Sequence, residues 1–279
     1  MKILVTGGCG FIGSNLVDYL VNALKHDVTV IDNLSSGDIK NVNVNASYIY
    51  DDLLTYEFTD GFDIIYHLAA PTAHIQYANE YTYGTLHENI NGVMRMCELA
   101  KRWSARLIYA GSVAYYTGRF TNPYSFSKTI GEEICKLYSM QYDIDISIGR
   151  FFNVYGNRQR TIGKYTSVVA IFDAAYKAGK PLPIIGDGKQ KRDFINVYDV
   201  VSFLINRLPS TDNKFMVYDV RSGHEISINE LAKLYNTQVE YIDKRDGEID
   251  QVDITDTGDV IDSIYNKYTL ENHIANIIL

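Results

Sequence analysis

Short β-branched stretches alternate with amphipathic stretches over the first half of the chain. Strands are predicted at residues 2–6, 28–31, 47–50, 63–68, 106–110 and 145–149. Helices are predicted at 11–24 and 86–103, where apolar residues such as Leu86, Ile90 and Val93 recur at helical spacing. Strands that alternate with helices form βαβ units around a parallel sheet. The pattern therefore predicts an α/β fold with a doubly wound, Rossmann-type parallel sheet.

The regular alternation ends near residue 150, where glycine and proline become frequent. We expect residues 1–155 to form the sheet domain, with residues 196–222 returning to it. Residues 156–195 and 223–279 are expected to form a smaller lobe that faces the substrate.

Charge and cysteine usage narrow the function classes. The 279 residues include 26 Lys and Arg against 34 Asp and Glu, a formal net charge of −8. Such a chain has no long-range attraction for nucleic acid or an anionic membrane, and no apolar run approaches the roughly 18 residues of a membrane span. Cys9, Cys97 and Cys135 form no Cys-x-x-Cys motif, which predicts neither a metal site nor disulfides. With no targeting segment recognised, a cytoplasmic protein is expected.

A glycine-rich turn lies between the first predicted strand and the first predicted helix. Gly7, Gly10 and Gly13 are spaced as in a dinucleotide-binding turn, where glycines allow close backbone approach and a helix N-terminus faces a pyrophosphate. Asp32 follows 19 residues after Gly13, at the end of the second predicted strand. A carboxylate there accepts from both ribose hydroxyls and repels a 2′-phosphate, which favours NAD over NADP. The alternative is a strand-to-helix turn without a ligand.

Tyr124 and Lys128 form a second chemical signal, at the start of a helical pattern introduced by Pro123. Residues four apart project from one helix face, so the phenol and the ammonium can address the same ligand. Acting as a base at neutral pH requires a tyrosine pKa lowered by roughly 3 units from about 10. The lysine and a positive nicotinamide ring could lower it jointly. Taken alone, such a pair is more often an ordinary helix-surface pair.

With these motifs in place, the chain resembles the extended short-chain dehydrogenase/reductases of the NAD-dependent epimerase/dehydratase family, most closely the UDP-sugar (UDP-glucose) 4-epimerases. The resemblance runs from Met1 to about Asp250. It rests on residues 6–13, 32–34, 52–53, 67–70, 150–156, 186–188 and 192–195, and on the Tyr-x-x-x-Lys pair.

The resemblance implies roles for individual residues. The catalytic residues would be Ser112, Tyr124 and Lys128. NAD would be bound by Gly7, Gly10, Phe11, Ile12, Gly13, Asp32, Asn33, Leu34, Ser36, Asp52, Leu53, Leu68, Ala69, Ala70, Asn89, Tyr124, Lys128 and Phe152. The substrate would be held by Ser112, Tyr124, Asn153, Arg192 and Arg245, since a guanidinium matches phosphate geometry. Either arginine could instead form a surface salt bridge.

The residues after Ser112 bear on the type of reaction. Sugar 4,6-dehydratases of the family place an Asp-Glu pair there and the related decarboxylases a Glu, whereas this chain has Val113 and Ala114. The resemblance therefore favours 4-epimerisation of a nucleotide sugar by transient oxidation at C4, on tightly bound NAD. A nucleotide-sugar 4-ketoreductase and a non-catalytic NAD-binding regulator stay as alternatives.

Some features depart from the family pattern. Only 12 residues lead from Ser112 to Tyr124, and the C-terminus is shorter than usual, so the choice of sugar is where the resemblance is weakest. Residues 86–103 and 126–138 match helices that pair into a four-helix dimer interface in relatives. A homodimer is therefore expected by analogy.

Overall fold

The computed structural model describes residues 1–71, 79–161, 166–206, 214–243 and 261–278. In these ranges, an eight-stranded sheet has the order β3-β2-β1-β4-β5-β6-β10-β13, and every neighbouring pair is parallel. The order of the first six strands is that of a doubly wound dinucleotide-binding sheet. The predicted Rossmann-type fold is confirmed. The strands are β1 (Lys2–Thr6), β2 (Asp27–Ile31), β3 (Ser47–Ile49), β4 (Ile64–His67), β5 (Arg106–Ser112), β6 (Ile146–Phe151), β10 (Phe215–Arg221) and β13 (Ile261–Ile264).

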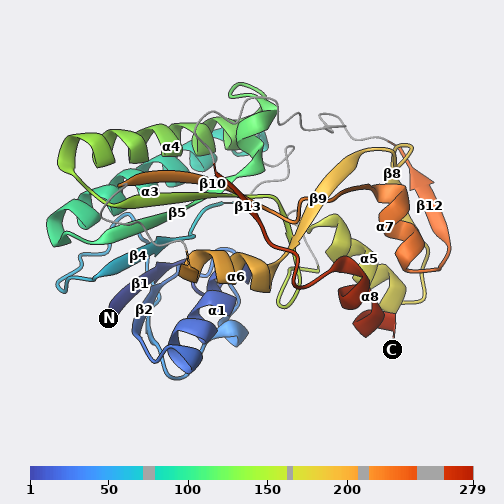
Figure 1. Cartoon of the computed structure of the whole chain (residues 1–279), viewed down its shortest axis with the longest axis horizontal. Helices are drawn as coiled ribbons and strands as arrows, with labels where there is room; N and C mark the ends of the chain where they lie inside the picture. The colour runs from blue at the N-terminus through green and yellow to red at the C-terminus, as the bar shows by residue number, and fades with distance from the viewer. Residues whose placement is uncertain (72–78, 162–165, 207–213, 244–260, 279) are drawn as a thin grey trace.

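Helices cover both faces of this sheet, with α3 and α4 on one face and α1 and α6 on the other (Figure 1). Within β1, Ile3 and Val5 belong to one hydrophobic cluster and Leu4 to a second. Because both faces of the sheet are buried, its strands are almost continuously apolar. The helices are α1 (Phe11–Asp18), α3 (Thr82–Trp103), α4 (Pro123–Tyr142) and α6 (Val197–Asn206).

The elements differ from the predicted ones mainly at their ends. Strand β5 extends to Ser112 because Gly111 and Ser112 pair with Arg150 and Phe151 of β6. The first predicted helix is α-helical only to Asp18 and continues as a π-helical turn over Tyr19–Ala23. Helix α3 begins at Thr82, four residues before the predicted start. Hydrophobic periodicity does not predict which distant strands pair, nor where the local geometry of a helix changes.

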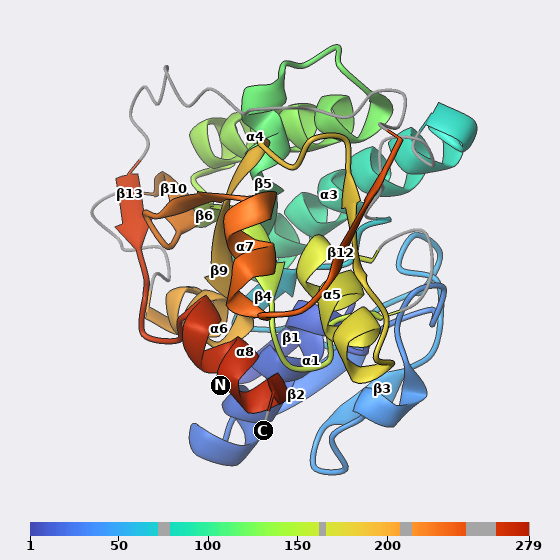
Figure 2. The same cartoon turned by 90° about the vertical axis from the view of Figure 1, so that its right-hand side faces the viewer.

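A smaller lobe packs around a third hydrophobic cluster and lies in front of the sheet in Figure 2. The cluster includes Tyr155, Phe172, Leu231 and Ile274. Strand β13, near the end of the chain, instead lies beside β10 in the main sheet. The predicted domain boundaries stay a prediction. The remaining elements are β7 (Asn153–Tyr155), α5 (Val168–Lys177), β8 (Leu182–Ile185), β9 (Lys191–Asn196), β11 (Glu225–Ser227), α7 (Ile228–Leu234), β12 (Val239–Ile242) and α8 (Leu270–Ile278), with 3-10 turns at Ile39–Asn41 and Val113–Thr117.

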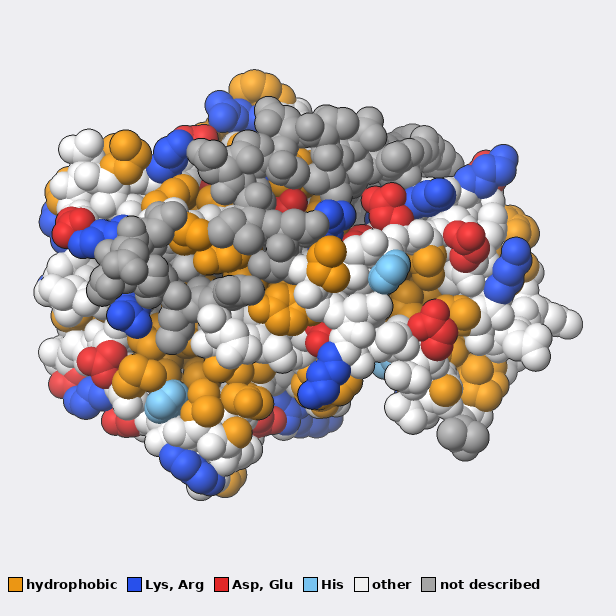
Figure 3. Space-filling model, viewed as in Figure 1, with side chains coloured by type: hydrophobic (Ala, Val, Ile, Leu, Met, Phe, Trp, Pro, Cys, Tyr) orange, Lys and Arg blue, Asp and Glu red, His pale blue; other side chains and the backbone are white. Residues whose placement is uncertain are grey.

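The surface carries mixed charge. On the face drawn in Figure 3, acidic and basic side chains are interspersed. Within the described ranges, no helix combines the length and apolar character that crossing a membrane requires. In the same ranges, no group of three or more His, Cys, Asp and Glu side chains is arranged to hold a metal ion.

Candidate active site

A cavity of about 600 Å³ opens at the carboxyl ends of the first strands of the sheet, where ligands bind in doubly wound folds. Most of the residues predicted from the sequence line it. They are Gly7, Gly10, Phe11, Ile12, Gly13, Asp32, Asn33, Ser36, Asp52, Leu53, Leu68, Ala69, Ala70, Ser112, Tyr124, Lys128 and Phe152. The fold thus brings together side chains that are more than 140 positions apart in the sequence.

The glycine-rich turn has no room for side chains. Gly7 has a φ of +70°, and a Cβ on it would lie 2.8 Å from the backbone nitrogen of Ala69. A Cβ on Gly13 would lie 2.2 Å from the carbonyl oxygen of Gly7. Helix α1 begins directly after Gly10, which makes no side-chain capping hydrogen bond. The N–H groups of this first turn therefore suit a diphosphate, as the sequence predicted.

Asp32 joins the end of β2 to this turn. Its Oδ2 accepts a hydrogen bond of 2.9 Å from the backbone N–H of Cys9, and its Oδ1 accepts one of 2.9 Å from the N–H of Leu34. The carboxylate is buried and lines the cavity. Leu34 itself does not line the cavity, although Asn33 does. Asp32 can therefore fix the phosphate-binding turn and also present negative charge to a ribose.

The start of α4 positions Tyr124. Asn122 caps the helix by accepting a hydrogen bond of 2.9 Å from the N–H of Ser125, and Pro123 occupies the first turn. Tyr124 follows at once, and its phenol lies close enough to the hydroxyl of Ser112, the last residue of β5, for that hydroxyl to affect its pKa. The hydroxyl of Ser112 also accepts a hydrogen bond of 3.1 Å from the N–H of Ala114. Two hydroxyl groups thus meet at the cavity wall.

Lys128 lies one helical turn after Tyr124 and is almost completely buried. Its Nζ donates a hydrogen bond of 2.8 Å to the carbonyl oxygen of Ala110 and lies 5.8 Å from the centroid of the Tyr124 ring. Burial lowers the pKa of Lys128 to about 8, and the nearby carboxylate of Glu132 opposes that shift. The lysine thus keeps its charge at neutral pH and can lose it in mildly alkaline solution.

Burial raises the pKa of Tyr124, and the hydroxyl of Ser112 partly opposes the rise. A tyrosine that accepts a proton at neutral pH needs a pKa shifted the other way. The ammonium of Lys128 supplies one positive charge close to the ring. Any further lowering has to come from the positive charge of a bound ligand, as the sequence analysis anticipated.

Four predicted site residues do not line the cavity. One is Leu34, described above. Asn89 is buried between α3 and α4, where its Nδ2 donates a hydrogen bond of 2.9 Å to Ser127 Oγ. Asn153 Nδ2 donates one of 2.9 Å to the carbonyl oxygen of Asp193, and Arg192 Nη1 donates one of 2.7 Å to the carbonyl of Lys191. A fifth, Arg245, lies outside the described residues.

The cavity also includes residues that sequence reasoning missed. The missed residues are Ile31, Ser35, Asp51, Leu54, Pro71, Glu88, Ala110, Gly111, Phe151, Val154, Gln159, Arg160 and Ser167. His87 lines the cavity as well. Gln159 and Arg160 come three and four residues after the end of the family motif at 150–156. Their position in the loop after a β-strand could have identified them from the sequence, because such loops often carry binding residues.

Comparisons with known proteins agree with this arrangement. A model of the NAD dependent epimerase/dehydratase family matches residues 3–220. UDP-glucose 4-epimerase of Mycolicibacterium smegmatis is 35% identical over 257 residues, 83% of this chain and 80% of its own length. UDP-glucuronic acid decarboxylase 3 of Arabidopsis thaliana is 32% identical over 254 residues, 84% of this chain and 73% of its own.

A solved structure extends the likeness over the full chain. UDP-glucose 4-epimerase of Thermotoga maritima, determined with UDP-glucose, has a TM-score of 0.84 at 27% identity and covers 100% of this chain and 97% of its own. Epimerases and decarboxylases are therefore similar to this chain to nearly the same degree. Overall similarity does not choose between their reactions, so the choice has to rest on the site.

Proposed function

Since the chain belongs to the NAD-dependent epimerase/dehydratase family, whose cofactor is NAD, we propose that it is a nucleotide-sugar 4-epimerase. Its substrate is proposed to be a UDP-sugar of the glucose/galactose type. The family membership already makes the chain a nucleotide-sugar enzyme. The proposal adds the reaction and the sugar class, and it rests on the side chains that surround Tyr124.

One observation carries the choice of reaction. Val113 and Ala114, which follow Ser112, bear no acid. In the described ranges, the carboxylates that line the cavity are those of Asp32, Asp51, Asp52 and Glu88. Asp32 bonds to the phosphate-binding turn, and Glu88 lies close to Asp52 and His87. Near Tyr124 the wall offers hydroxyls and one ammonium, which suit proton transfer to and from a hydroxyl rather than elimination or loss of a carboxyl group.

The residues at the cavity have distinct roles in this proposal. Tyr124 accepts the proton of the sugar 4-hydroxyl, and Ser112 hydrogen-bonds the same oxygen. Lys128 stabilises the phenolate by its charge. NAD, when bound, supplies the hydride acceptor. The 4-keto sugar then turns over in the site, C4 takes back the hydride from the reduced cofactor on its other face, and Tyr124 returns the proton to the oxygen. The opposite configuration results at C4.

The fit to NAD rests on features of this chain. The glycine turn admits only backbone, the first turn of α1 is open to a diphosphate, and Asp32 lies where a ribose needs an acceptor. The charge of Asp32 disfavours the 2′-phosphate of NADP. For the substrate we propose contacts from Asn153, Arg192 and Arg245, carried over from the family.

A panel of substrates tests the proposal. Purified protein is incubated with UDP-galactose, UDP-N-acetylgalactosamine and UDP-glucuronate, and products are identified by NMR while absorbance at 340 nm follows NADH. Interconversion at C4 without accumulated NADH supports the proposal and identifies the sugar. Release of CO₂ from UDP-glucuronate would instead support a decarboxylase. Net NADH consumption with a 4-keto sugar would support a ketoreductase, and binding of NAD without any conversion would support a regulator.

We further propose a homodimer through α3 and α4. These helices lie side by side on one face of the sheet (Figure 1). Their surfaces carry exposed apolar side chains. Tyr83 is 79% exposed, Leu137 55% and Met140 70%. Light scattering coupled to size-exclusion chromatography tests this proposal. A dimeric mass that becomes monomeric in Leu137→Glu/Met140→Glu supports it, and a monomeric wild-type chain contradicts it.

A further inference from the structure

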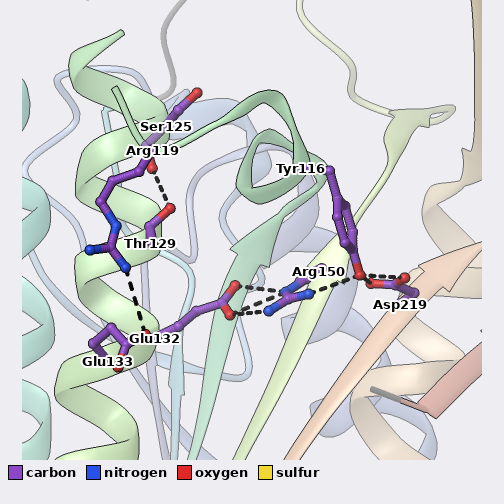
Figure 4. Close-up of polar contacts among 8 residues, drawn as sticks. All are labelled: Tyr116, Arg119, Ser125, Thr129, Glu132, Glu133, Arg150 and Asp219. Carbon is purple, nitrogen blue, oxygen red and sulfur yellow. Dashed lines mark hydrogen bonds and ion pairs between the residues drawn. The ribbon is translucent and has the colours of Figure 1, made fainter. Parts of the chain in front are cut away.

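A chain of polar contacts between side chains links α4 to β10 (Figure 4). The carboxylate of Glu132 accepts from Arg150 at both oxygens, with Nε at 3.1 Å from each and Nη2 at 2.8 Å from Oε2. Arg150 Nη1 donates to the hydroxyl of Tyr116 at 2.8 Å. That hydroxyl donates to the carboxylate of Asp219, at 2.9 and 2.8 Å from its two oxygens.

The members of this chain come from four elements. Glu132 lies one turn after Lys128 on α4, Arg150 is on β6, Tyr116 is in the 3-10 turn after Ser112, and Asp219 is on β10. Both charged partners of the ion pair are buried, with side-chain exposures of 5% for Arg150 and 6% for Glu132. None of these four side chains lines the cavity.

The turn over Val113–Thr117 connects this chain of contacts to Ser112. Ser112 caps the turn through its bond with Ala114, and the face of the Tyr115 ring lies 3.4 Å from the guanidinium carbon of Arg150. At the end of the turn, the hydroxyls of Thr117 and Ser125 are 2.9 Å apart, next to Tyr124 on α4. Two contacts therefore hold the end of the turn, one from Thr117 to α4 and one from Tyr116 to Arg150.

We propose that Tyr116 is a positioning residue, whose hydroxyl, held between Arg150 and Asp219, fixes the turn after Ser112 and so keeps Ser112 against Tyr124. The inference deepens the proposed function, because it concerns the geometry of the same two hydroxyls. The direction of the bonds is set by the partners: Arg150 can only donate, and Asp219 as a carboxylate only accepts, so Tyr116 has a single orientation. Because Glu132, Arg150 and Asp219 are buried and each is bonded within this network, the network holds its side chains in place.

The turn needs this support in a chain where Ser112 and Tyr124 are separated by few residues. The segment that connects them is too short to form a loop with its own packed interior. Gly118, at the centre of this segment, has a φ of +96°. Side-chain contacts to β6 and β10 replace that packing. A small displacement of Ser112 matters because proton transfer depends on the alignment of the reacting groups.

Tyr116→Phe tests the proposal, with Tyr235→Phe as the matched control. Tyr235 also donates to a buried carboxylate, at 2.7 Å from Asp173 Oδ1, but it belongs to the smaller lobe and does not itself line the cavity. Turnover and Michaelis constant for the UDP-sugar, NAD affinity and thermal unfolding are measured for the wild type and both variants. We expect kcat of Tyr116→Phe to fall by tens of fold, on the order of 100-fold at most. KM and NAD affinity should change by less than about threefold, whereas Tyr235→Phe keeps kcat and loses only stability.

Crystal structures of both variants supply a second readout that is independent of turnover. In Tyr116→Phe the hydroxyl of Ser112 should move away from Tyr124, and in Tyr235→Phe it should not. An unmoved Ser112, or an equal loss of kcat in both variants, would overturn the inference. If the wild type converts no nucleotide sugar, the proposed function fails, and the position of Ser112 still decides whether Tyr116 positions it.

Discussion

The ammonium nitrogen of Lys128 donates a hydrogen bond of 2.8 Å to the carbonyl oxygen of Ala110, and this bond joins α4 to β5 at the wall of the cavity. Because Ala110 is two residues before Ser112, the bond fixes Lys128 on the strand that also positions Ser112. The lysine therefore holds its charge at a defined place beside Tyr124. Its contribution can be separated from that of the fold by substitution.

Lys128→Met keeps the length of the side chain and removes the charge and the donor. We expect turnover to fall by at least about 100-fold, since the phenol of Tyr124 loses the cation that stabilises its ionised form. Steady-state kinetics with the UDP-sugar identified above measure the effect. Lys136→Met is the control, because Lys136 is exposed and lies two turns later on the same helix. Equal activity in the two variants would contradict the role given to Lys128.

The pH dependence should reflect the lysine. An amine carries its charge below its pKa, so activity should fall as pH rises through about 8, the pKa of Lys128. In Glu132→Gln the carboxylate that raises this pKa is lost and Arg150 is left uncompensated, and both changes lower the pKa. The alkaline limb of the kcat profile should therefore move to lower pH. The other titratable or charged groups around Lys128 are Tyr124, Cys135, Tyr109 and His67.

These neighbouring groups do not change the expected direction of the shift in the alkaline limb. The pKa of His67 is about 3, because of burial first and the charge of Lys128 second, so it stays neutral in the range measured. Burial raises the pKa of Tyr109 and of Cys135 well above their usual range. A limb that stays in place or moves to higher pH in Glu132→Gln would show that Lys128 does not govern it.

Asp32→Ala tests the ribose-binding end of the site. Hydrogen bonds to a charged group contribute roughly 1.5–3 kcal/mol each, so we expect NAD affinity to fall by about 10- to 100-fold. The preference for NAD over NADP should also shrink, because the repelling charge is gone. Isothermal titration with both dinucleotides measures both effects. Asp27→Ala, at the exposed opposite end of β2, should leave them unchanged, and a matching loss there would exclude a specific role for Asp32.

Gly13→Ala tests the packing of the phosphate-binding turn. The added methyl group would lie 2.2 Å from the carbonyl oxygen of Gly7, a backbone atom that cannot move aside cheaply. We expect a loss of stability of about 1–3 kcal/mol and no detectable NAD binding. Gly92→Ala is the control, since a methyl group there would meet no backbone atom among its nearest neighbours, which are side-chain atoms of His67 at 3.4 Å and Leu53 at 3.8 Å. Thermal unfolding with and without NAD distinguishes the two, and retained binding in Gly13→Ala would contradict the account.

Local signals in the sequence were sufficient for much of the site. The spacing of Gly7, Gly10 and Gly13 follows from one strand-turn-helix unit, and the pairing of Tyr124 with Lys128 follows from helix geometry. Asp32 could be predicted because the end of a second parallel strand must lie beside the end of the first. The fold brings these residues to the wall of one cavity, and what they bind there stays a prediction.

Contacts between distant elements could not be predicted in the same way. The periodicity of α3 does not reveal that Glu88 reaches the cavity, because helix orientation depends on packing against α4. Nor does the sequence show that Tyr116 and Asp219, 103 positions apart, share a hydrogen bond. The residues that orient a site are the ones whose partners lie on other elements, and only the folded structure brings those together.

Conversion of a UDP-sugar in D₂O tests the central claim most directly. If Tyr124 handles only the hydroxyl proton and the hydride returns from the cofactor to the same carbon, NMR should show the C4 epimer with hydrogen, not deuterium, on the sugar carbons. Incorporation of deuterium at a sugar carbon would contradict the account, because it requires a group that removes a proton from carbon, which the described residues around Tyr124 do not offer.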